Sequence, residues 1–276
     1  MLEKMLRSLP EIKKIFVMIR PRKNVTIEER LISTIFSSEI FKRVWEEQPR
    51  LRAKILEKVK PIAGDLIIDK LGISPSDRAI LRQEVNVIIN SAASVNFDDP
   101  LLDAIQINYM GALKMQDLAF ECENLAAHVH VSTAYVNCNR PGGLIEEKIF
   151  DLEGEDPEDI IAKIQNMNPQ YITDNEKTLI GGYPNTYTYT KSMAERTFKK
   201  RCGNLPAAIV RPSSITACLN EPFAGWTDTI AATGGMCLAS GMGIIHYIKC
   251  SPDTIFDIIP ADLVSNLVIA AAYFRA

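Results

Sequence analysis

Two groups of polar side chains have residue types and a spacing that suit proton transfer. Tyr187 and Lys191 are four positions apart in a segment with helical character, so their side chains lie on one face of the helix. A lysine ammonium beside a phenol favours the phenolate and lowers the tyrosine pKa, so the tyrosine can exchange a proton near neutral pH. Upstream, Ser132 and Thr133 follow an apolar segment, where a hydroxyl could hold a substrate carbonyl oxygen beside Tyr187. A Tyr-x-x-x-Lys motif alone occurs by chance in many proteins, so the prediction of carbonyl chemistry depends on both groups together.

The segments around these groups alternate between short apolar runs and helical stretches. Thr26 and Glu29 form a capping-box pattern at the start of one of the helices. Strands of four to six apolar residues that alternate with helices are typical of a parallel sheet covered on both faces. The sequence therefore predicts a doubly wound α/β fold, in which ligands lie at the carboxyl ends of the strands. The expected strands are residues 15–19, 59–63, 85–89, 128–132 and 207–210, and the expected helices include residues 1–9, 101–122, 186–202 and 262–274.

The order of a strand-end Ser/Thr followed by Tyr-x-x-x-Lys on such a fold resembles the extended short-chain dehydrogenases/reductases. Further motifs look like those of the reductase domain of alcohol-forming fatty acyl-CoA reductases, in family order and over essentially the whole chain. These motifs are His-Val-Ser-Thr-Ala-Tyr (130–135), Pro-Asn-Thr-Tyr-Thr-Tyr-Thr-Lys (184–191), Ile-Val-Arg-Pro-Ser (209–213), Asn-Ser-Ala-Ala (90–93) with Phe97-Asp98, Gly225-Trp226 and Ile-Pro-Ala-Asp (259–262). The resemblance implies NADPH-dependent reduction of long-chain fatty acyl-CoA to a fatty alcohol through an aldehyde.

The resemblance also implies roles for particular residues. The catalytic hydroxyl maps to Thr133, with Ser132 as an alternative that stays open, and Tyr187 would protonate the developing oxyanion. Asn108 matches a helix asparagine that helps to arrange a proton-relay water. Lys191 could also bind a cofactor ribose.

The segment after Arg211 is expected to cover the acyl chain of the substrate. Its substrate residues would be Pro222, Gly225 and Trp226. We therefore expect an NADP-binding, Rossmann-type reductase part at residues 1–211 and a substrate-covering part at residues 212–276.

The turn after the expected strand at 15–19 favours NADPH on physical grounds. In doubly wound folds the end of the second strand faces the adenosine ribose, where an acidic residue would bond the 2′-hydroxyl of NAD. This chain has Arg20 there, with Arg22 and Lys23 close behind, and these cations suit a 2′-phosphate. A solvated basic turn is the alternative. The other positions expected at the cofactor are Asp65 near the adenine, Ala92 and Ala93 on the nicotinamide side, Lys191 and Pro212.

One part of the family pattern has no match in the sequence. The family has a strand and a Gly-x-x-Gly-x-x-Gly turn before the first helix, whereas this chain begins at that helix. The turn would form the amide cradle for the pyrophosphate, and the strand would be the central one of the 3-2-1-4-5-6 order. We therefore expect the strands at 15–19 and 85–89 to expose unpaired edges. The hypothesis is a truncated product or fragment that is poorly stable alone and lacks the family's C-terminal helical region and membrane anchor.

Composition argues against several other classes of protein. The net charge of −3 gives no general attraction to nucleic acid. The six cysteines form no Cys-x-x-Cys pair and are interpreted as reduced thiols, and His128 and His130 lack a third ligand, so no metal site is expected. Residues 229–248 carry no formal charge, but their glycines and hydroxyl residues favour a buried loop and helix over a membrane span. The acidic stretch 146–159 is expected to be a solvated loop.

Other functions remain open at this point. Within the enzymes, the alternatives are a thioester reductase of carrier-bound acyl groups or another extended short-chain reductase, such as an epimerase-like member. From a different class, the alternative is an inactive truncated remnant or a binding protein. The resemblance further implies an intracellular location, either facing the cytosol on the endoplasmic reticulum membrane or in peroxisomes.

Overall fold

The computed structural model describes residues 1–152, 154–230, 233–251 and 253–276. Its contacts divide the chain into two compact units. Unit 1 is Met1–Ile62 with Pro212–Ala270, and unit 2 is Ala63–Arg211 with Ala271–Ala276. This division shares the boundary after Arg211 with the one expected from the sequence, and it differs in grouping the first 62 residues with the C-terminal part.

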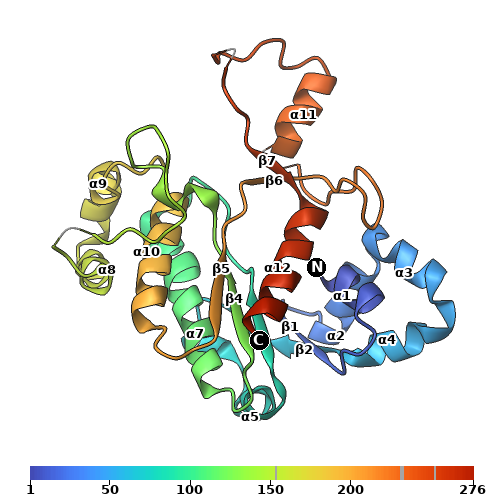
Figure 1. Ribbon diagram of the computed structural model, residues 1–276. Coiled ribbons are helices and arrows are strands. Elements are labelled where there is room, and N and C mark those ends of the chain that lie inside the picture. Colours follow the sequence, from blue (N-terminus) through green and yellow to red (C-terminus); the bar gives the residue numbers. More distant parts are fainter. Residues whose placement is uncertain (153, 231–232, 252) are drawn as a thin grey trace. The chain divides into compact units, whose positions relative to one another are not determined.

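Unit 2 contains a three-stranded parallel sheet with the order β3 (Val87–Asn90), β4 (Ala127–Val131) and β5 (Ala207–Val210). Two helices, α7 (Gly111–Glu121) and α10 (Thr186–Arg201), lie side by side along one face of this sheet (Figure 1). The carboxyl ends of parallel strands meet at one edge of a sheet, so the residues that follow β3, β4 and β5 lie at a common edge.

The helix expected at 101–122 is confirmed, with an irregular middle. It begins as α6 (Leu101–Ala104), continues as the π-helical η5 (Ile105–Met110) and ends as α7. Such π-helical turns are often found at functional sites, and Asn108 lies in this one. At the start of α7, Gly111 allows close packing, because a Cβ there would lie 3.0 Å from the Cβ of Leu66. The core around this helix includes Leu101, Ile105, Tyr109, Leu113, Ile161, Ile172, Tyr189 and Met193.

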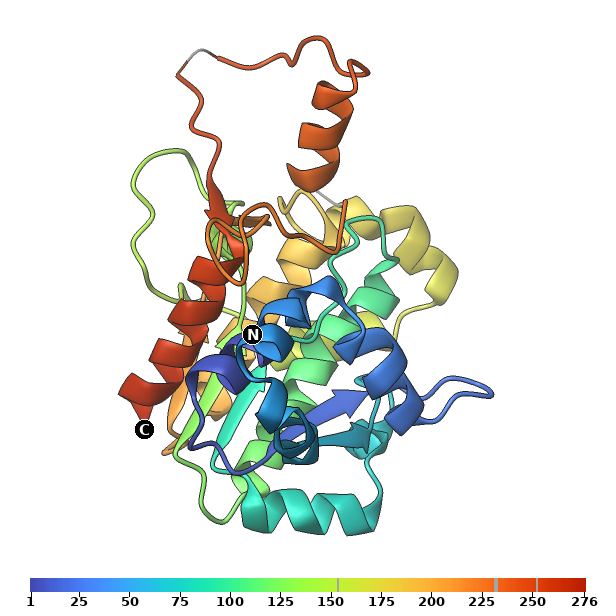
Figure 2. The ribbon, with the colours of Figure 1, turned by 90° about the vertical axis from the view of Figure 1, so that its right-hand side faces the viewer.

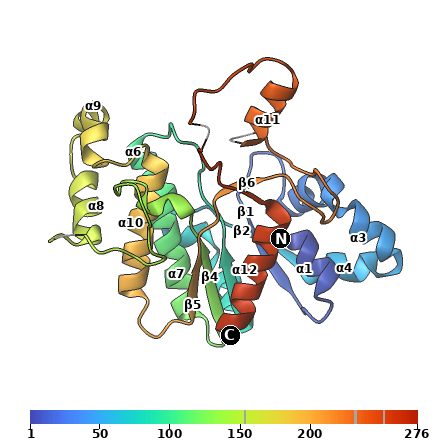
Figure 3. The ribbon, with the colours of Figure 1, turned by 45° about the horizontal axis from the view of Figure 1, so that its top comes forward.

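Unit 2 also has helices that the sequence analysis did not assign or only outlined. They are η4 (Asp69–Gly72), α5 (Pro75–Glu84), η6 (Ala134–Asn137), α8 (Pro157–Gln165) and α9 (Pro169–Leu179), and Figure 3 shows α8 and α9 beside α10. Helix α8 starts inside the acidic stretch that was expected to be a loop throughout, so that expectation was wrong for its last residues. Asp156 caps this helix and Ile161 and Ile164 are buried in the core, which explains why the helix forms.

Unit 1 starts with α1 (Leu2–Ser8) and β1 (Ile15–Ile19), and β1 pairs with β2 (Val59–Ala63). The predicted capping box is confirmed at the start of α2 (Ile27–Arg30): the Thr26 hydroxyl accepts from the Glu29 N–H at 3.1 Å, and the Glu29 carboxylate accepts from the Thr26 N–H at 2.9 Å. The chain then continues through η1 (Leu31–Phe36), η2 (Glu39–Phe41), α3 (Lys42–Glu47), η3 (Pro49–Leu51) and α4 (Arg52–Lys58). Their apolar side chains form a second core, which includes Leu6, Ile19, Leu31, Phe36, Phe41, Val44, Ile55 and Val59.

The C-terminal part of unit 1 contains a parallel pair of short strands, β6 (Ser214–Thr216) and β7 (Ile258–Pro260). Between them lies an excursion with α11 (Thr233–Gly241), and after β7 comes α12 (Ala261–Arg275) (Figure 2). The expectation of a buried loop and helix at 229–248 was wrong for the described residues after α11. Tyr247, for example, is 90% exposed, because this glycine-containing stretch has no amphipathic face to pack on a core.

The strand order agrees with the predicted doubly wound fold. β1 pairs with β2, and β3, β4 and β5 pair in that order. In the doubly wound order 3-2-1-4-5-6, the first pair corresponds to strands 2 and 3, and the second group corresponds to strands 4, 5 and 6. That first strand has no counterpart among the described residues, and there β1 and β3 have one strand partner each. Two expected strands have other bounds. The strand expected at 85–89 is Val87–Asn90, because Val85 still closes the last turn of α5 with an N–H to Leu81 O bond of 3.0 Å. The strand expected at 128–132 is Ala127–Val131.

Candidate active site

The end of β4 and the start of α10 bring two of the predicted catalytic residues together. The Ser132 N–H donates to Val210 O at 2.7 Å, which extends the pairing of β4 with β5 up to Thr133. The Asn185 side chain caps α10 by accepting from the Thr188 N–H at 2.9 Å, and this cap fixes the first turn that carries Tyr187. The side chains of Thr133 and Tyr187 are hydrogen-bonded to each other.

Tyr187 is half-buried beside Phe97, with their ring centroids 5.5 Å apart. Burial raises the pKa of Tyr187 above its ordinary value of 10.0, and the hydrogen bond with Thr133 opposes this shift. The spacing of Tyr187 and Lys191 predicts a pKa lowered by the ammonium, and this predicted direction is wrong. The raised pKa keeps the phenol protonated at neutral pH, which suits a proton donor.

Lys191 is buried, and its ammonium is held by the strand end rather than by the phenol. Lys191 Nζ donates to Val131 O at 2.9 Å. Burial lowers the pKa of Lys191 to about 8, and the nearby Glu195 carboxylate opposes this shift. The ammonium is therefore mainly protonated at neutral pH and places a buried positive charge at the carboxyl end of β4.

Ser132 adds a hydroxyl that is not used within the protein. Its side chain is buried, and its Oγ has no hydrogen-bond partner among the described residues. A buried hydroxyl without a partner is costly unless a ligand or water completes it. The strand end thus offers two adjacent hydroxyls, of which Thr133 contacts Tyr187 and Ser132 is free to bind.

Asn108 connects the loop after β3 with α10. Its Oδ1 accepts from the Ser94 N–H at 2.9 Å, and its Nδ2 donates to Ser94 O at 3.1 Å and to Thr190 Oγ1 at 3.4 Å. These bonds position the loop that follows β3 and contains Ala92 and Ala93. A role in a proton relay stays a prediction.

The remaining cofactor candidates lie in both units. In unit 2, Asp65 follows β2 and its carboxylate accepts from the Ile67 N–H at 3.2 Å. In unit 1, Arg20, Arg22 and Lys23 are exposed in the turn after β1. Arg22 and Val25 close this turn as a β-bridge. Pro212 is buried in unit 1.

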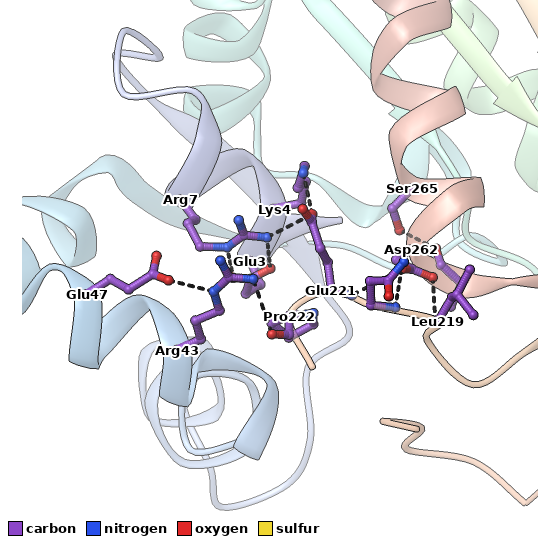
Figure 4. A network of polar contacts seen from close by, with 12 residues as sticks. Glu3, Lys4, Arg7, Arg43, Glu47, Leu219, Glu221, Pro222, Asp262 and Ser265 are labelled. Atoms are coloured by element: carbon purple, nitrogen blue, oxygen red, sulfur yellow. Dashed lines mark hydrogen bonds and ion pairs between the residues drawn. The ribbon is translucent and has the colours of Figure 1, made fainter. Parts of the chain in front are cut away.

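The three predicted substrate residues belong to a closed loop of unit 1. The Cys218 N–H donates to Trp226 O at 2.9 Å and the Gly225 N–H donates to Cys218 O at 2.8 Å, with Gly225 at a φ of 81° that favours glycine. Arg43 Nη1 donates to Pro222 O at 3.3 Å. Figure 4 shows this contact between Arg43 and Pro222.

The base of the same loop is held by charged side chains. The Asp262 carboxylate accepts from the N–H groups of Leu219, Asn220 and Glu221 at 2.9–3.1 Å. Burial raises the pKa of Asp262, but these backbone donors outweigh it, so the pKa lies below its ordinary value. Glu221 in turn forms ion pairs with Lys4 and Arg7 (Figure 4). Asp262, from the Ile-Pro-Ala-Asp motif, therefore holds the loop in place.

Sequence reasoning missed a buried ion pair behind Lys191. Arg211 Nε donates to the two carboxylate oxygens of Glu195 at 2.9 and 3.1 Å, and Arg211 Nη2 also bonds this carboxylate. The pair joins the second turn after Tyr187 to the end of β5. A signal was present, because Glu195 follows Lys191 by four positions and Arg211 follows an apolar strand.

The two histidines of β4 pack in the core. The rings of His128 and His130 lie 5.2 and 5.4 Å from the ring of Phe198. Across the described ranges, no cluster of three His, Cys, Asp or Glu side chains could hold a metal ion. In the same part of the chain, no helix is long and apolar enough to cross a bilayer.

The edge of the sheet in unit 2 fits the reactive end of a nicotinamide cofactor. Two polar groups lie there, the unpartnered Ser132 hydroxyl and the buried Lys191 ammonium. After β3, Ala92 and Ala93 have small side chains that leave space for a ligand. The fold and this site together define a doubly wound α/β domain with a candidate cofactor site at the carboxyl ends of its strands.

Comparison with known proteins identifies the family. The chain belongs to the male sterility protein family of NAD-binding domains, whose pattern it matches over residues 1–268, so its cofactor is of the nicotinamide class. It is 37% identical over 274 residues to fatty acyl-CoA reductase 1 of Gallus gallus, covering 99% of this chain and 52% of that one. It is 37% identical over 276 residues to fatty acyl-CoA reductase 2 of Mus musculus, covering 100% and 52%. The chain thus spans about half the length of these curated relatives.

Among solved structures, the terminal R domain from the myxalamid PKS-NRPS biosynthetic pathway has a similar fold. The TM-score is 0.64 at 21% identity, and the match covers 97% of this chain and 57% of that one. This likeness supports the doubly wound fold.

Proposed function

We propose that this chain is the reductase part of an enzyme that uses NADPH to reduce long-chain fatty acyl-CoA to fatty alcohol through an aldehyde. The observation that carries the proposal is the hydrogen bond between Thr133 and Tyr187 at the end of β4, with the Lys191 ammonium buried behind it. The names of the relatives, fatty acyl-CoA reductases 1 and 2, support the substrate class.

The residues of the site have distinct tasks in this proposal. Bound NADPH would supply one hydride to the thioester carbonyl, after which the C–S bond breaks and CoA leaves as the thiol. A second NADPH would supply the hydride that reduces the aldehyde to the alcohol. The hydroxyls of Ser132 and Thr133 hold the carbonyl oxygen of the thioester, and Tyr187 donates a proton to that oxygen as negative charge develops on it. Lys191, whose ammonium bonds Val131 O, is proposed to bind a ribose of the cofactor, and Asn108 keeps the loop after β3 in position.

The choice of NADPH rests on the turn after β1. Arg20, Arg22 and Lys23 are exposed there, and cations at this place suit a 2′-phosphate. Pro222, Gly225 and Trp226 are proposed to contact the acyl part of the substrate. For the location, we propose the cytosolic face of the endoplasmic reticulum or peroxisomes.

The test is a product assay with the 276-residue chain, palmitoyl-CoA and either NADPH or NADH, in which aldehyde and alcohol are quantified by mass spectrometry. The proposal expects alcohol with NADPH, and an R20Q/R22Q variant should reduce the preference for NADPH over NADH at least tenfold. Turnover of a carrier-bound acyl thioester but not of palmitoyl-CoA would favour the carrier-bound thioester reductase instead. No turnover and no cofactor binding by a folded sample would favour the inactive remnant.

A further inference from the structure

The excursion between β6 and β7 exposes large apolar side chains. In its segment Met242–Lys249, which we call the apolar segment, Met242, Ile244 and Tyr247 are 64%, 65% and 90% exposed, and Ile248 is also exposed. In Figure 2 the chain after α11 forms a long loop above α12. Soluble proteins rarely expose apolar groups this close together unless they meet a partner or a membrane there.

The charges in and around this segment favour one kind of partner. No acidic residue occurs between Asp228 and Asp253, whereas Lys249 lies at the end of the segment. Tyrosine and lysine next to aliphatic residues are typical of the membrane–water interface, where the ring and the ammonium reach the headgroups. The described helices are too short or too polar to cross a bilayer, so the segment suits shallow insertion.

The rest of unit 1 adds a positive charge. Its residues 1–62 contain 15 Lys and Arg against 8 Asp and Glu, a net charge of +7, although the whole chain has −3. Residues 212–270 contain one Lys and five Asp and Glu, so unit 1 as a whole has +3. A net positive unit is attracted to an anionic lipid surface.

We propose that the apolar segment docks this chain onto an anionic membrane by inserting Ile244, Tyr247 and Ile248 among the lipid headgroups. The docking itself is independent of the catalytic proposal. If that proposal holds, docking brings the enzyme to the place where long-chain acyl substrates partition. A second copy of the chain is the competing occupant, and the test separates the two.

The test is flotation of the 276-residue chain with vesicles of phosphatidylcholine alone or with 30% phosphatidylserine. We expect binding to the anionic vesicles, weaker binding in 1 M salt, and an at least tenfold loss in the variant I244S/Y247S/I248S. The matched control L144S/Y171S/Y273S changes exposed apolar residues of unit 2 and should bind like the unchanged chain. Circular dichroism melting checks that both variants fold.

Three results would overturn the proposal. The first is no binding of the unchanged chain to either vesicle. The second is equal binding by the two triple variants. The third is an oligomer, measured by light scattering, that only I244S/Y247S/I248S dissociates, because the segment would then be covered by a second copy.

Discussion

Breaking the ion pair between Glu195 and Arg211 should destabilise unit 2 strongly. The side chains are 2% and 14% exposed, and Arg211 donates to both carboxylate oxygens. In Glu195→Met, Arg211 loses this partner and keeps one acceptor, Lys148 O at 3.1 Å. Removal of one partner of a buried pair costs about 3–5 kcal/mol, and the remaining acceptor places the expected cost near the lower end, at about 3 kcal/mol.

The double variant E195M/R211M distinguishes pairing from packing. Replacing both partners with apolar side chains of similar volume removes the unpaired charge, so the double variant should be more stable than either single variant. For a domain of this size, about 3 kcal/mol corresponds to a fall in Tm of about 6–12 °C. Asp117→Asn, which removes the exposed pair with Arg201, is the control and should change stability by less than about 1 kcal/mol.

The assay is urea unfolding followed by circular dichroism and tryptophan fluorescence. Trp45 and Trp226 both lie in unit 1, so their fluorescence reports on that unit while circular dichroism reports on both. We expect the variants to shift the transition seen by circular dichroism. Losses below about 1 kcal/mol in both single variants, or a double-variant loss equal to their sum, would refute the reasoning.

Three further predictions concern stability. Burial lowers the pKa of His128 from 6.5 to about 4. Between these pH values the unfolded chain therefore binds more protons at this histidine than the folded chain does. The free energy of unfolding should fall by about 3 kcal/mol through His128 as the pH drops through this window. Burial also lowers the pKa of His130 well below 6.5, so both histidines contribute to this slope. Urea midpoints from pH 7 to 4 should show the slope, His128→Leu should reduce it, and the double variant H128L/H130L should remove most of it. Thr26→Ala should lower the free energy of unfolding by about 1 kcal/mol through loss of the capping box, as measured by urea unfolding followed by tryptophan fluorescence. Thr26→Ser keeps a capping hydroxyl, so a urea midpoint for this variant as low as that of Thr26→Ala would contradict the capping account. Tyr189→Phe should leave the melting temperature unchanged or raise it, because this buried hydroxyl has no partner among the described residues, and a loss above about 1 kcal/mol would show that the hydroxyl is bound.

Several elements could be predicted closely from sequence. The strands at 15–19, 59–63 and 207–210 have the predicted bounds. The first and third are short apolar runs between polar or turn residues, and the second, which contains Lys60, ends before Gly64-Asp65. Helices α8 and α9 were missed although Asp156-Pro157 and Asn168-Pro169 are N-terminal capping signals. The acidic residues before α8 favour a solvated loop and so obscure the first of these signals.

The site was predictable in its residue types and less so in its contacts. The spacing of Tyr187 and Lys191 places them on one helical face, but the bond of Lys191 to Val131 O depends on how α10 packs against β4. The direction of the Tyr187 pKa depends on burial, which the sequence does not contain. The exposure of Tyr247 was missed for a similar reason, because an uncharged composition does not tell whether a core covers the segment.

The most direct test of the central claim compares Tyr187→Phe with Tyr189→Phe in the reduction of palmitoyl-CoA by NADPH. Both variants remove one half-buried or buried hydroxyl from α10, but only the hydroxyl of Tyr187 bonds Thr133. Loss of a positioned proton donor costs a factor of about 10²–10⁴, so kcat should fall by at least 100-fold in Tyr187→Phe and stay within twofold in Tyr189→Phe. Equal rates for Tyr187→Phe and the unchanged chain, with both folded and binding NADPH, would contradict the claim that this site performs the reduction.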